Sequence, residues 1–228
     1  MNSFTGSELV IAFIAAFAAT LVYGSFLEWI FHRYFMHLPT WGVTHFFKGH
    51  AKVHHKIYQG DTSYAVGDRD PQEVTLAWWA MPIIPIVHIP FMIVLYFQFG
   101  MSAAVGMFTA CVFYQASYEY LHYCMHVPQG RLIERLPYYR WLNDHHLQHH
   151  RKHFTNLNVF IPIADYVFGT RRSCARPDAV TITQKVGYLP KDRKPSRLAL
   201  PRKMALETWM AMRFLQKRLF KYARFAGA

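Results

Sequence analysis

Two long windows of the sequence contain no lysine or arginine, and this feature limits the possible folds more than any other. The windows cover residues 1–32 and 71–130, so all 25 basic residues lie in 33–69 and 131–228. A membrane protein must keep charge out of hydrocarbon and collects Lys and Arg on its cytoplasmic side, whereas a soluble protein has no such constraint. The formal net charge of +12 therefore predicts a membrane-facing surface and no nucleic-acid partner.

The first window contains an apolar segment, Leu9–Phe31, whose one ionisable residue is Glu28. Its length is enough for a helix to cross a bilayer core of about 30 Å. Ala16-Phe17-Ala18 resembles a signal-peptidase site, but the segment lacks a positively charged start and its apolar run continues past this point. We therefore expect a retained transmembrane helix and not a cleaved signal peptide.

The second window contains two further apolar segments, Val74–Phe99 and Met101–Leu121, which we expect to form a helical hairpin around Gly100. Prolines 82, 85 and 90 predict kinks in the first of these segments. The sequence thus predicts an all-α integral membrane helical bundle of about three spans. Because the basic residues collect on the inner side, the N-terminus is expected outside and the C-terminus inside.

The last part of the chain differs in composition from the rest. Residues 171–203 are rich in Arg, Lys and Pro and predict a basic connector, and residues 204–225 predict a final amphipathic helix. We therefore divide the chain into a membrane and histidine domain, 1–170, and a basic C-terminal region, 171–228. Two interpretations of the final helix stay open: it lies on anionic headgroups, or it packs on the domain with a solvated basic face.

Fourteen histidines are the main anomaly of the composition, and ten of them fall into four short segments. On an α-helix, residues four apart share a face, which predicts that His50 and His54 lie together, as do His122 and His126. A five-residue step separates two side chains by about 140°, so His32 and His37 could share a metal only if the helix ends between them. The four segments contain His32 and His37; His50, His54 and His55; His122 and His126; and His146, His149 and His150.

Ten imidazoles on one side of a membrane predict a di-metal centre. Five ligands for each of two metals would leave about one open position apiece in a near-octahedral shell, as oxygen-activating iron requires. Structural zinc sites close at four ligands and prefer thiolates, and the three cysteines are too scattered to supply them. Catalytic zinc stays open, because histidines alone do not identify the ion.

Other residues near the four segments are weaker candidates. Glu28, Glu119 and Asp144 each lie close to a candidate ligand and could accept its second N–H, although Asp144 could instead cap the helix of the fourth segment. His88 is expected to be a buried, hydrogen-bonded residue, and His45, His145 and His153 to flank the centre. Aromatic candidates for lining a substrate path, with packing as the alternative role, are Tyr34, Tyr118 and Tyr123.

The segments HRYFMH, HAKVHH, HYCMH and HLQHH, followed by DYVFGT, resemble the integral-membrane fatty acid hydroxylase/sterol desaturase superfamily over about residues 24–170. The resemblance implies a cytosolic helical cap that holds a di-iron centre, which activates O₂ against an unactivated C–H bond of a lipid; zinc can replace the iron in a prepared sample. It adds Asp165 of DYVFGT as a possible partner around the ligands. The implied ligands are His32, His37, His50, His54, His55, His122, His126, His146, His149 and His150.

The HxxxHH spacing at His50 departs from the HxxHH more often seen in lipid hydroxylases and is also found in carotenoid hydroxylases. The position of His50, or of His45 in its place, is therefore open, as is the choice among lipid hydroxylase, carotenoid ring hydroxylase and lipid or sterol desaturase. No fused haem domain is recognised, so we expect electrons from a separate ferredoxin-like or haem protein. A membrane metal or haem carrier is the alternative outside enzymes, but it would require histidines inside the spans, where only His88 lies.

Overall fold

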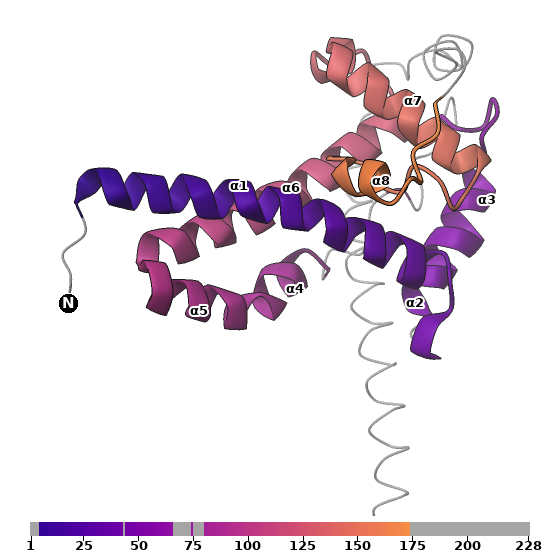
Figure 1. Ribbon diagram of the computed structural model, residues 1–228. Coiled ribbons are helices and arrows are strands. Elements are labelled where there is room, and N and C mark those ends of the chain that lie inside the picture. The colour runs from indigo at the N-terminus through magenta and orange to yellow at the C-terminus, as the bar shows by residue number, and fades with distance from the viewer. Residues whose placement is uncertain (1–4, 43, 66–73, 75–79, 174–228) are drawn as a thin grey trace, which may run out of the picture.

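The computed structural model describes residues 5–42, 44–65, 74 and 80–173, and in these ranges every regular element is a helix (Figure 1). The expected all-α class is confirmed. The basic connector and final helix lie outside the described residues. The helices are α1 (Gly6–Phe31), η1 (His32–Met36), η2 (Thr40–Gly42), α2 (His45–Phe47), η3 (Lys48–His54), α3 (His55–Ile57), α4 (Ala80–Val87), α5 (Ile89–Phe99), α6 (Met101–His126), η4 (Ile133–Arg135), α7 (Pro137–Arg151) and α8 (Ile163–Val167).

Helix α1 is the longest apolar element, and it begins before the apolar run does. Thr5 caps it: the Thr5 hydroxyl accepts from the Glu8 backbone N–H, and the Glu8 carboxylate accepts from the Thr5 N–H. This reciprocal pair satisfies two donors that a helix start leaves free. With η1 it continues unbroken to Met36, and in the described part of the chain it is the one helix both long and apolar enough to cross a membrane.

Helix α6 lies along α1 at very close range (Figure 1). A Cβ atom at Gly106 would stand 2.5 Å from the Phe13 carbonyl oxygen, and one at Gly24 would stand 2.7 Å from the Tyr114 ring. Only glycine allows two helix backbones to approach this far. At the far end of the pair, the Ser102 hydroxyl donates to the Leu9 carbonyl oxygen over 2.6 Å.

The proline-rich segment does not form one kinked span. It forms α4 and α5, separated at His88, because Pro90 has no N–H to continue the hydrogen-bond ladder across the break. Gly100, with φ of 85°, then makes the sharp turn into α6. The expected hairpin is therefore present, but α5 has only 11 residues, and the expectation of three full spans is supported by the described residues for α1 alone.

A helical cap covers one end of the α1–α6 pair (Figure 1). It consists of η1, η3, α7, α8 and the loop at 152–162, and its hydrophobic core joins α6 to α7 through buried side chains such as Leu121, Met125, Leu142 and Leu147. Helix α7 begins at Pro137, which the fixed φ of proline favours at a first helical position. Asp144 therefore lies inside this helix, and the suggestion that it caps the helix start is wrong.

Candidate metal centre

The structure brings the ten candidate histidines together as two groups of five, and every one of them is buried. Within each group the potential ligand atoms all lie within 4.8 Å of one another. We name the groups after the type of helix that carries their paired histidines. The π group contains His32, His37, His50, His55 and His149, and the α group contains His54, His122, His126, His146 and His150.

Two short π-helices build the π group. The His37 N–H donates to the His32 carbonyl, and the His55 N–H to the His50 carbonyl, so each pair closes a five-residue step. In a π-helix, residues five apart lie about one turn apart, whereas in an α-helix they diverge. His50 therefore pairs with His55, and the expected pairing of His50 with His54 is wrong.

Ordinary α-helices build most of the α group. His122 and His126 lie one turn apart at the end of α6, and His146 and His150 lie one turn apart on α7, as α-helical spacing predicts. The fifth member, His54, comes from the π-helix η3, while His149 of α7 belongs to the π group. Each group thus takes one histidine from an element that mainly serves the other group.

Main-chain carbonyls orient the outer ring nitrogens of the π group. His32 Nδ1 lies 2.5 Å from the Leu157 carbonyl oxygen, and His149 Nδ1 lies 3.0 Å from that of Thr155. Because a carbonyl oxygen can only accept, Nδ1 must carry the proton, and each Nε2 atom is left with a lone pair directed into the group.

The α group uses the same device with a different segment. His126 Nδ1 lies 2.7 Å from the Tyr64 carbonyl oxygen, and His150 Nδ1 lies 2.6 Å from that of Tyr58. The sequence did not predict any of the four main-chain carbonyls that accept from these histidines, because a main-chain oxygen carries no sequence signal.

The spacing of the inner nitrogens fits a metal ion in each group. Nε2–Nε2 separations are 2.8 Å for His32–His50, 3.0 Å for His50–His55 and for His146–His150, and 3.1 Å for His126–His146. With a metal–nitrogen bond of about 2.1 Å, adjacent ligands of an octahedron stand about 3.0 Å apart and those of a tetrahedron about 3.4 Å. His122 Nε2 is buried with no hydrogen-bond partner in the described structure, as a ligand atom would be.

The cap holds these imidazoles in the neutral form that binds metals. Burial, reinforced by neighbouring imidazoles, lowers the pKa of His146, His149 and His150 well below the usual 6.5. The same causes lower the pKa of His50 and His55. Metal ligation requires the deprotonated ring nitrogen, so the site does not have to lose protons before an ion binds near neutral pH.

Two of the acidic candidates contact a loop and not an imidazole of either group. Glu28 accepts from the Tyr114 hydroxyl over 2.6 Å and from the Val159 N–H over 2.5 Å. Asp165 accepts from the N–H groups of Leu157 and Asn158 over 2.9 and 2.8 Å. Both carboxylates therefore hold the loop whose Leu157 carbonyl orients His32.

Asp165 also accepts a buried hydrogen bond from His145, over 3.0 Å between Oδ2 and Nε2. Burial by itself raises the pKa of Asp165, but the hydrogen bonds from His145, Thr170 and the Asn158 N–H outweigh it and leave the pKa below its ordinary value. The carboxylate is thus ionised, and His145 contacts it and lies outside both histidine groups.

The remaining candidates are spread around the centre. Glu119 accepts from Gln115, His88 hydrogen-bonds to Tyr23 and to the Ile84 carbonyl as expected, and His45 is exposed outside both groups. Among the aromatic candidates, buried Tyr118 packs beside His122, with ring centroids 5.7 Å apart. Tyr34 is 40% exposed and packs on Trp29, and Tyr123 packs against the cluster of Tyr58 and Val127.

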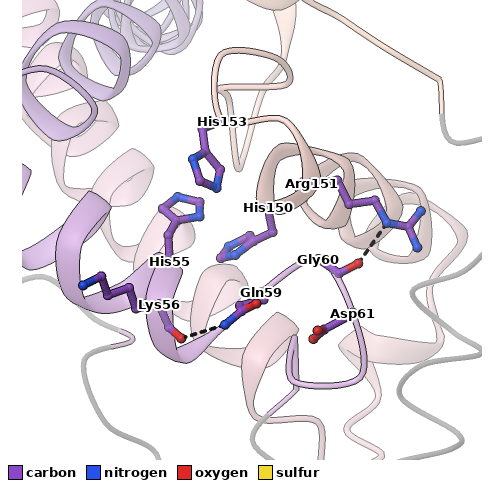
Figure 2. Close-up of a pocket in the computed structure, with 8 residues that line it drawn as sticks. All are labelled: His55, Lys56, Gln59, Gly60, Asp61, His150, Arg151 and His153. Atoms are coloured by element: carbon purple, nitrogen blue, oxygen red, sulfur yellow. Dashed lines mark hydrogen bonds between the residues drawn. The ribbon is translucent and has the colours of Figure 1, made fainter.

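An open pocket of about 460 Å³ reaches both histidine groups from outside the cap (Figure 2). His55 of the π group and His150 of the α group line it, and their ring centroids are 4.3 Å apart. His153 lines the same pocket, 4.3 Å from His55. The other lining residues are Lys56, Gln59, Gly60, Asp61 and Arg151.

An all-helical membrane protein with two buried five-histidine groups in a cap is the class that the fold and the site define. The sequence model described as fatty acid hydroxylase matches residues 17–170. The chain therefore belongs to the fatty acid hydroxylase family, within the sterol desaturase/fatty acid hydroxylase superfamily. Comparisons with curated proteins and with solved structures gave no match. Family and site together support a hydroxylase- or desaturase-type oxygenase at a membrane.

Proposed function

We propose that this chain is an O₂-dependent lipid hydroxylase with a di-iron centre, acting on an unactivated C–H bond of an acyl chain. The observation that carries the proposal is the pair of buried five-imidazole groups directly at the end of an apolar helix. The reaction balances as RH + O₂ + 2 e⁻ + 2 H⁺ → ROH + H₂O. Two irons, when bound, supply the O₂ activation and the hydrogen abstraction.

The protein's own contribution is to hold ligands, exclude water and orient the substrate. The carbonyls of Leu157 and Thr155 fix two rings of the π group, and those of Tyr58 and Tyr64 fix two rings of the α group. Such partners of ligand imidazoles keep the ring orientation and raise the basicity of the ligand atom. Burial of all ten rings limits the access of water to the centre.

The donor set supports iron as the resident metal. Neutral imidazole suits iron as well as zinc, but structural zinc closes at four ligands and favours thiolates. Each group offers five nitrogens, and neither contains a cysteine. Five donors leave one position open on a near-octahedral ion for O₂, and the separations near 3.0 Å fit that geometry.

We propose that the substrate comes from the bilayer and the electrons from a separate protein. α1 carries an apolar surface straight into η1, where His32 and His37 begin the π group. The distribution of Lys and Arg favours an outer N-terminus and a cap on the cytoplasmic side. A ferredoxin-like or haem protein would then supply one electron at a time.

A second candidate within the enzymes is carotenoid ring hydroxylation. The observation that favours it is the HxxxHH segment, in which His50 is a full member of the π group and exposed His45 is not. Desaturation shares the first hydrogen abstraction and is a further alternative. A metal or haem carrier is disfavoured, because His88 is occupied by Tyr23 and the Ile84 carbonyl.

Reconstitution with Fe(II), a reductant and O₂ in membranes of defined lipid tests the proposal. We expect a lipid product that gains one oxygen atom, seen by mass spectrometry, and no product from His149→Ala. His45→Ala is the matched control, since His45 is exposed outside both groups, and it should keep the activity. A protein that binds no metal and leaves lipids unchanged would contradict the proposal, and oxidation of carotene alone would favour the second candidate.

A further inference from the structure

Two basic residues, Lys56 and Arg151, and one acidic residue, Asp61, line the pocket that reaches both histidine groups, and further basic residues adjoin the first two in the sequence. Lys48, Lys52 and Lys56 recur every four residues along η3 and α3, and all three are exposed, while the histidines of the same segment are buried. At the end of α7, Arg151 and Lys152 are also exposed, and we call these five residues the basic face. In the described part of the chain, none of the three lysines forms an ion pair with a carboxylate.

A chain of aromatic rings leads from this face to both groups. His153 is exposed at the pocket and its ring centroid lies 4.3 Å from that of His55, a member of the π group. The His55 ring lies 4.3 Å from His150 of the α group. Figure 2 shows the three rings gathered along one side of the pocket. An electron carrier seated here would come within van der Waals contact of rings that reach both groups.

The position of the face favours a soluble partner over lipid. In Figure 1, α3 lies beyond the His32 end of α1, on the opposite side of the molecule from α4 and α5. The exposed apolar side chains of α5, among them Phe91, Val94 and Phe97, mark the part that meets hydrocarbon. The segment that carries Lys56 therefore lies away from α4 and α5, and the three exposed lysines of η3 and α3 are accessible to an acidic protein.

We propose that this face, Lys56 and Arg151 at the pocket with Lys48, Lys52 and Lys152 on the adjoining turns of the chain, is the docking surface for an acidic one-electron donor protein. The inference rests on the proposed function and says where its electron donor binds. In each turnover two donor molecules each lose one electron. These two electrons, two protons, O₂ and the lipid substrate give the hydroxylated lipid and one water. Opposite charges across the interface accelerate the encounter and orient the donor toward the pocket.

The experiment measures how fast an acidic [2Fe–2S] ferredoxin, reduced beforehand, reduces the iron-loaded protein in neutral-lipid nanodiscs at low salt. For Lys52→Glu/Lys56→Glu we expect the second-order rate constant to fall by about tenfold or more, with a weaker salt dependence. Lys52→Gln/Lys56→Gln should fall by less. Iron content and reduction by dithionite, which needs no protein docking, report whether the centre is intact in each variant.

Arg135→Glu/Arg140→Glu is the matched control, because both arginines are exposed near the opposite end of α7 and the charge change is the same. We expect less than a twofold effect. Equal reduction of the Lys52→Glu/Lys56→Glu variant and the wild type, or an equal loss in the control, would overturn the docking surface. The same rates are also measured in anionic nanodiscs. A fall in the rate constant of the Lys52→Glu/Lys56→Glu variant seen only there would also overturn the docking surface, since it would make the face a lipid contact. A wild-type protein that takes up no iron or resists dithionite would overturn the proposed function itself.

Discussion

The two histidine groups lie side by side and have the same number of rings, yet they are built on different helices. The π group takes two pairs of ligands from five-residue steps in η1 and η3, and the α group takes two pairs from four-residue steps in α6 and α7. This comparison shows that lengthening the hydrogen-bonded step from four residues to five is enough to change which histidines share an ion. Around η3, this spacing places His54 in the α group and His50 and His55 in the π group.

A second contrast concerns the supports of the two groups. The loop beside the π group is held by two carboxylates, Glu28 from α1 and Asp165 from α8. The segment 58–64 beside the α group is held by a neutral hydrogen bond, 2.8 Å from the Tyr64 hydroxyl to the Asn143 side-chain oxygen, and by an exposed one, 3.0 Å from Arg151 Nε to the Gly60 carbonyl oxygen. The hydrogen bonds to ionised Asp165 are both charged and buried, which makes them stronger than neutral bonds or bonds exposed to solvent, so the π group is expected to depend more on its outer partners.

The largest expected effect comes from removing one ligand of each group. His149→Ala takes a ring from the π group and His150→Ala from the α group, although the two residues are neighbours. Each variant should lose one of two bound iron ions and all hydroxylase activity, and the double variant should bind none. Metal analysis by plasma mass spectrometry gives the count, and single variants that both retain two ions would break the comparison.

A one-residue insertion tests the spacing of the π group directly. An alanine inserted after Tyr34, which is 40% exposed and between His32 and His37, lengthens their step to six residues, a step that neither a π-helix nor an α-helix places one turn apart. We expect the loss of one ion, because the His37 ring leaves the π group. Tyr34→Ala keeps the five-residue step and should keep both ions; an intact metal content after the insertion would show that the one-turn spacing is not needed.

Asp165→Asn should weaken the π group without emptying it. The amide has one oxygen where the carboxylate has two. If this oxygen takes the place of Oδ2 and accepts from His145 and the Asn158 N–H, the amide NH₂ group faces the Leu157 N–H, which loses its acceptor, so the loop that orients His32 loosens. Changes of such partners cost about 10–100-fold in metal affinity. Chelator competition should show one weakened ion and one unchanged ion. Asp144→Asn, in α7 and outside both groups, is the control, and equal weakening of both ions by Asp165→Asn would contradict the account.

Tyr64→Phe should have the smallest effect. It removes the hydrogen bond to Asn143 and leaves the Tyr64 carbonyl on His126 in place. Loss of one buried hydrogen bond costs about 1–3 kcal/mol of unfolding free energy, so the protein should unfold at lower denaturant and keep both ions. An iron loss as large as that of His150→Ala would mean that the segment 58–64 depends on this one bond.

The sequence predicted the helical class, the long first helix and all ten histidines that the structure gathers, because apolar runs and repeated histidines follow simple periodic rules. It predicted the pairing correctly for His122 and His126, where the helix is α. The predicted pairing of His50 was wrong, because no residue in KGHAKVH indicates a π-helix. The prolines predicted a kink in one helix, but the structure has a break between α4 and α5.

Interactions between distant segments explain the rest of what sequence reasoning missed. Proximity to His32 in sequence suggests that Glu28 contacts an imidazole, and the family resemblance suggests the same for Asp165. Both instead bind the loop before α8, which at Val159 is 131 residues from Glu28 and at Asn158 is seven residues from Asp165. The four carbonyl partners of the histidines belong to Tyr58, Tyr64, Thr155 and Leu157, whose side chains give no indication of that role. Such contacts depend on the tertiary structure alone.

Anomalous diffraction from crystals of the iron-loaded protein, measured at the iron absorption edge, tests the central claim most directly. The account requires two separate peaks, one within bonding distance of His32, His37, His50, His55 and His149, and one within bonding distance of the other five histidines. His54 must then lie on the second ion while its neighbour His55 lies on the first. A single peak, or two peaks with His50 and His54 on one ion, would contradict it.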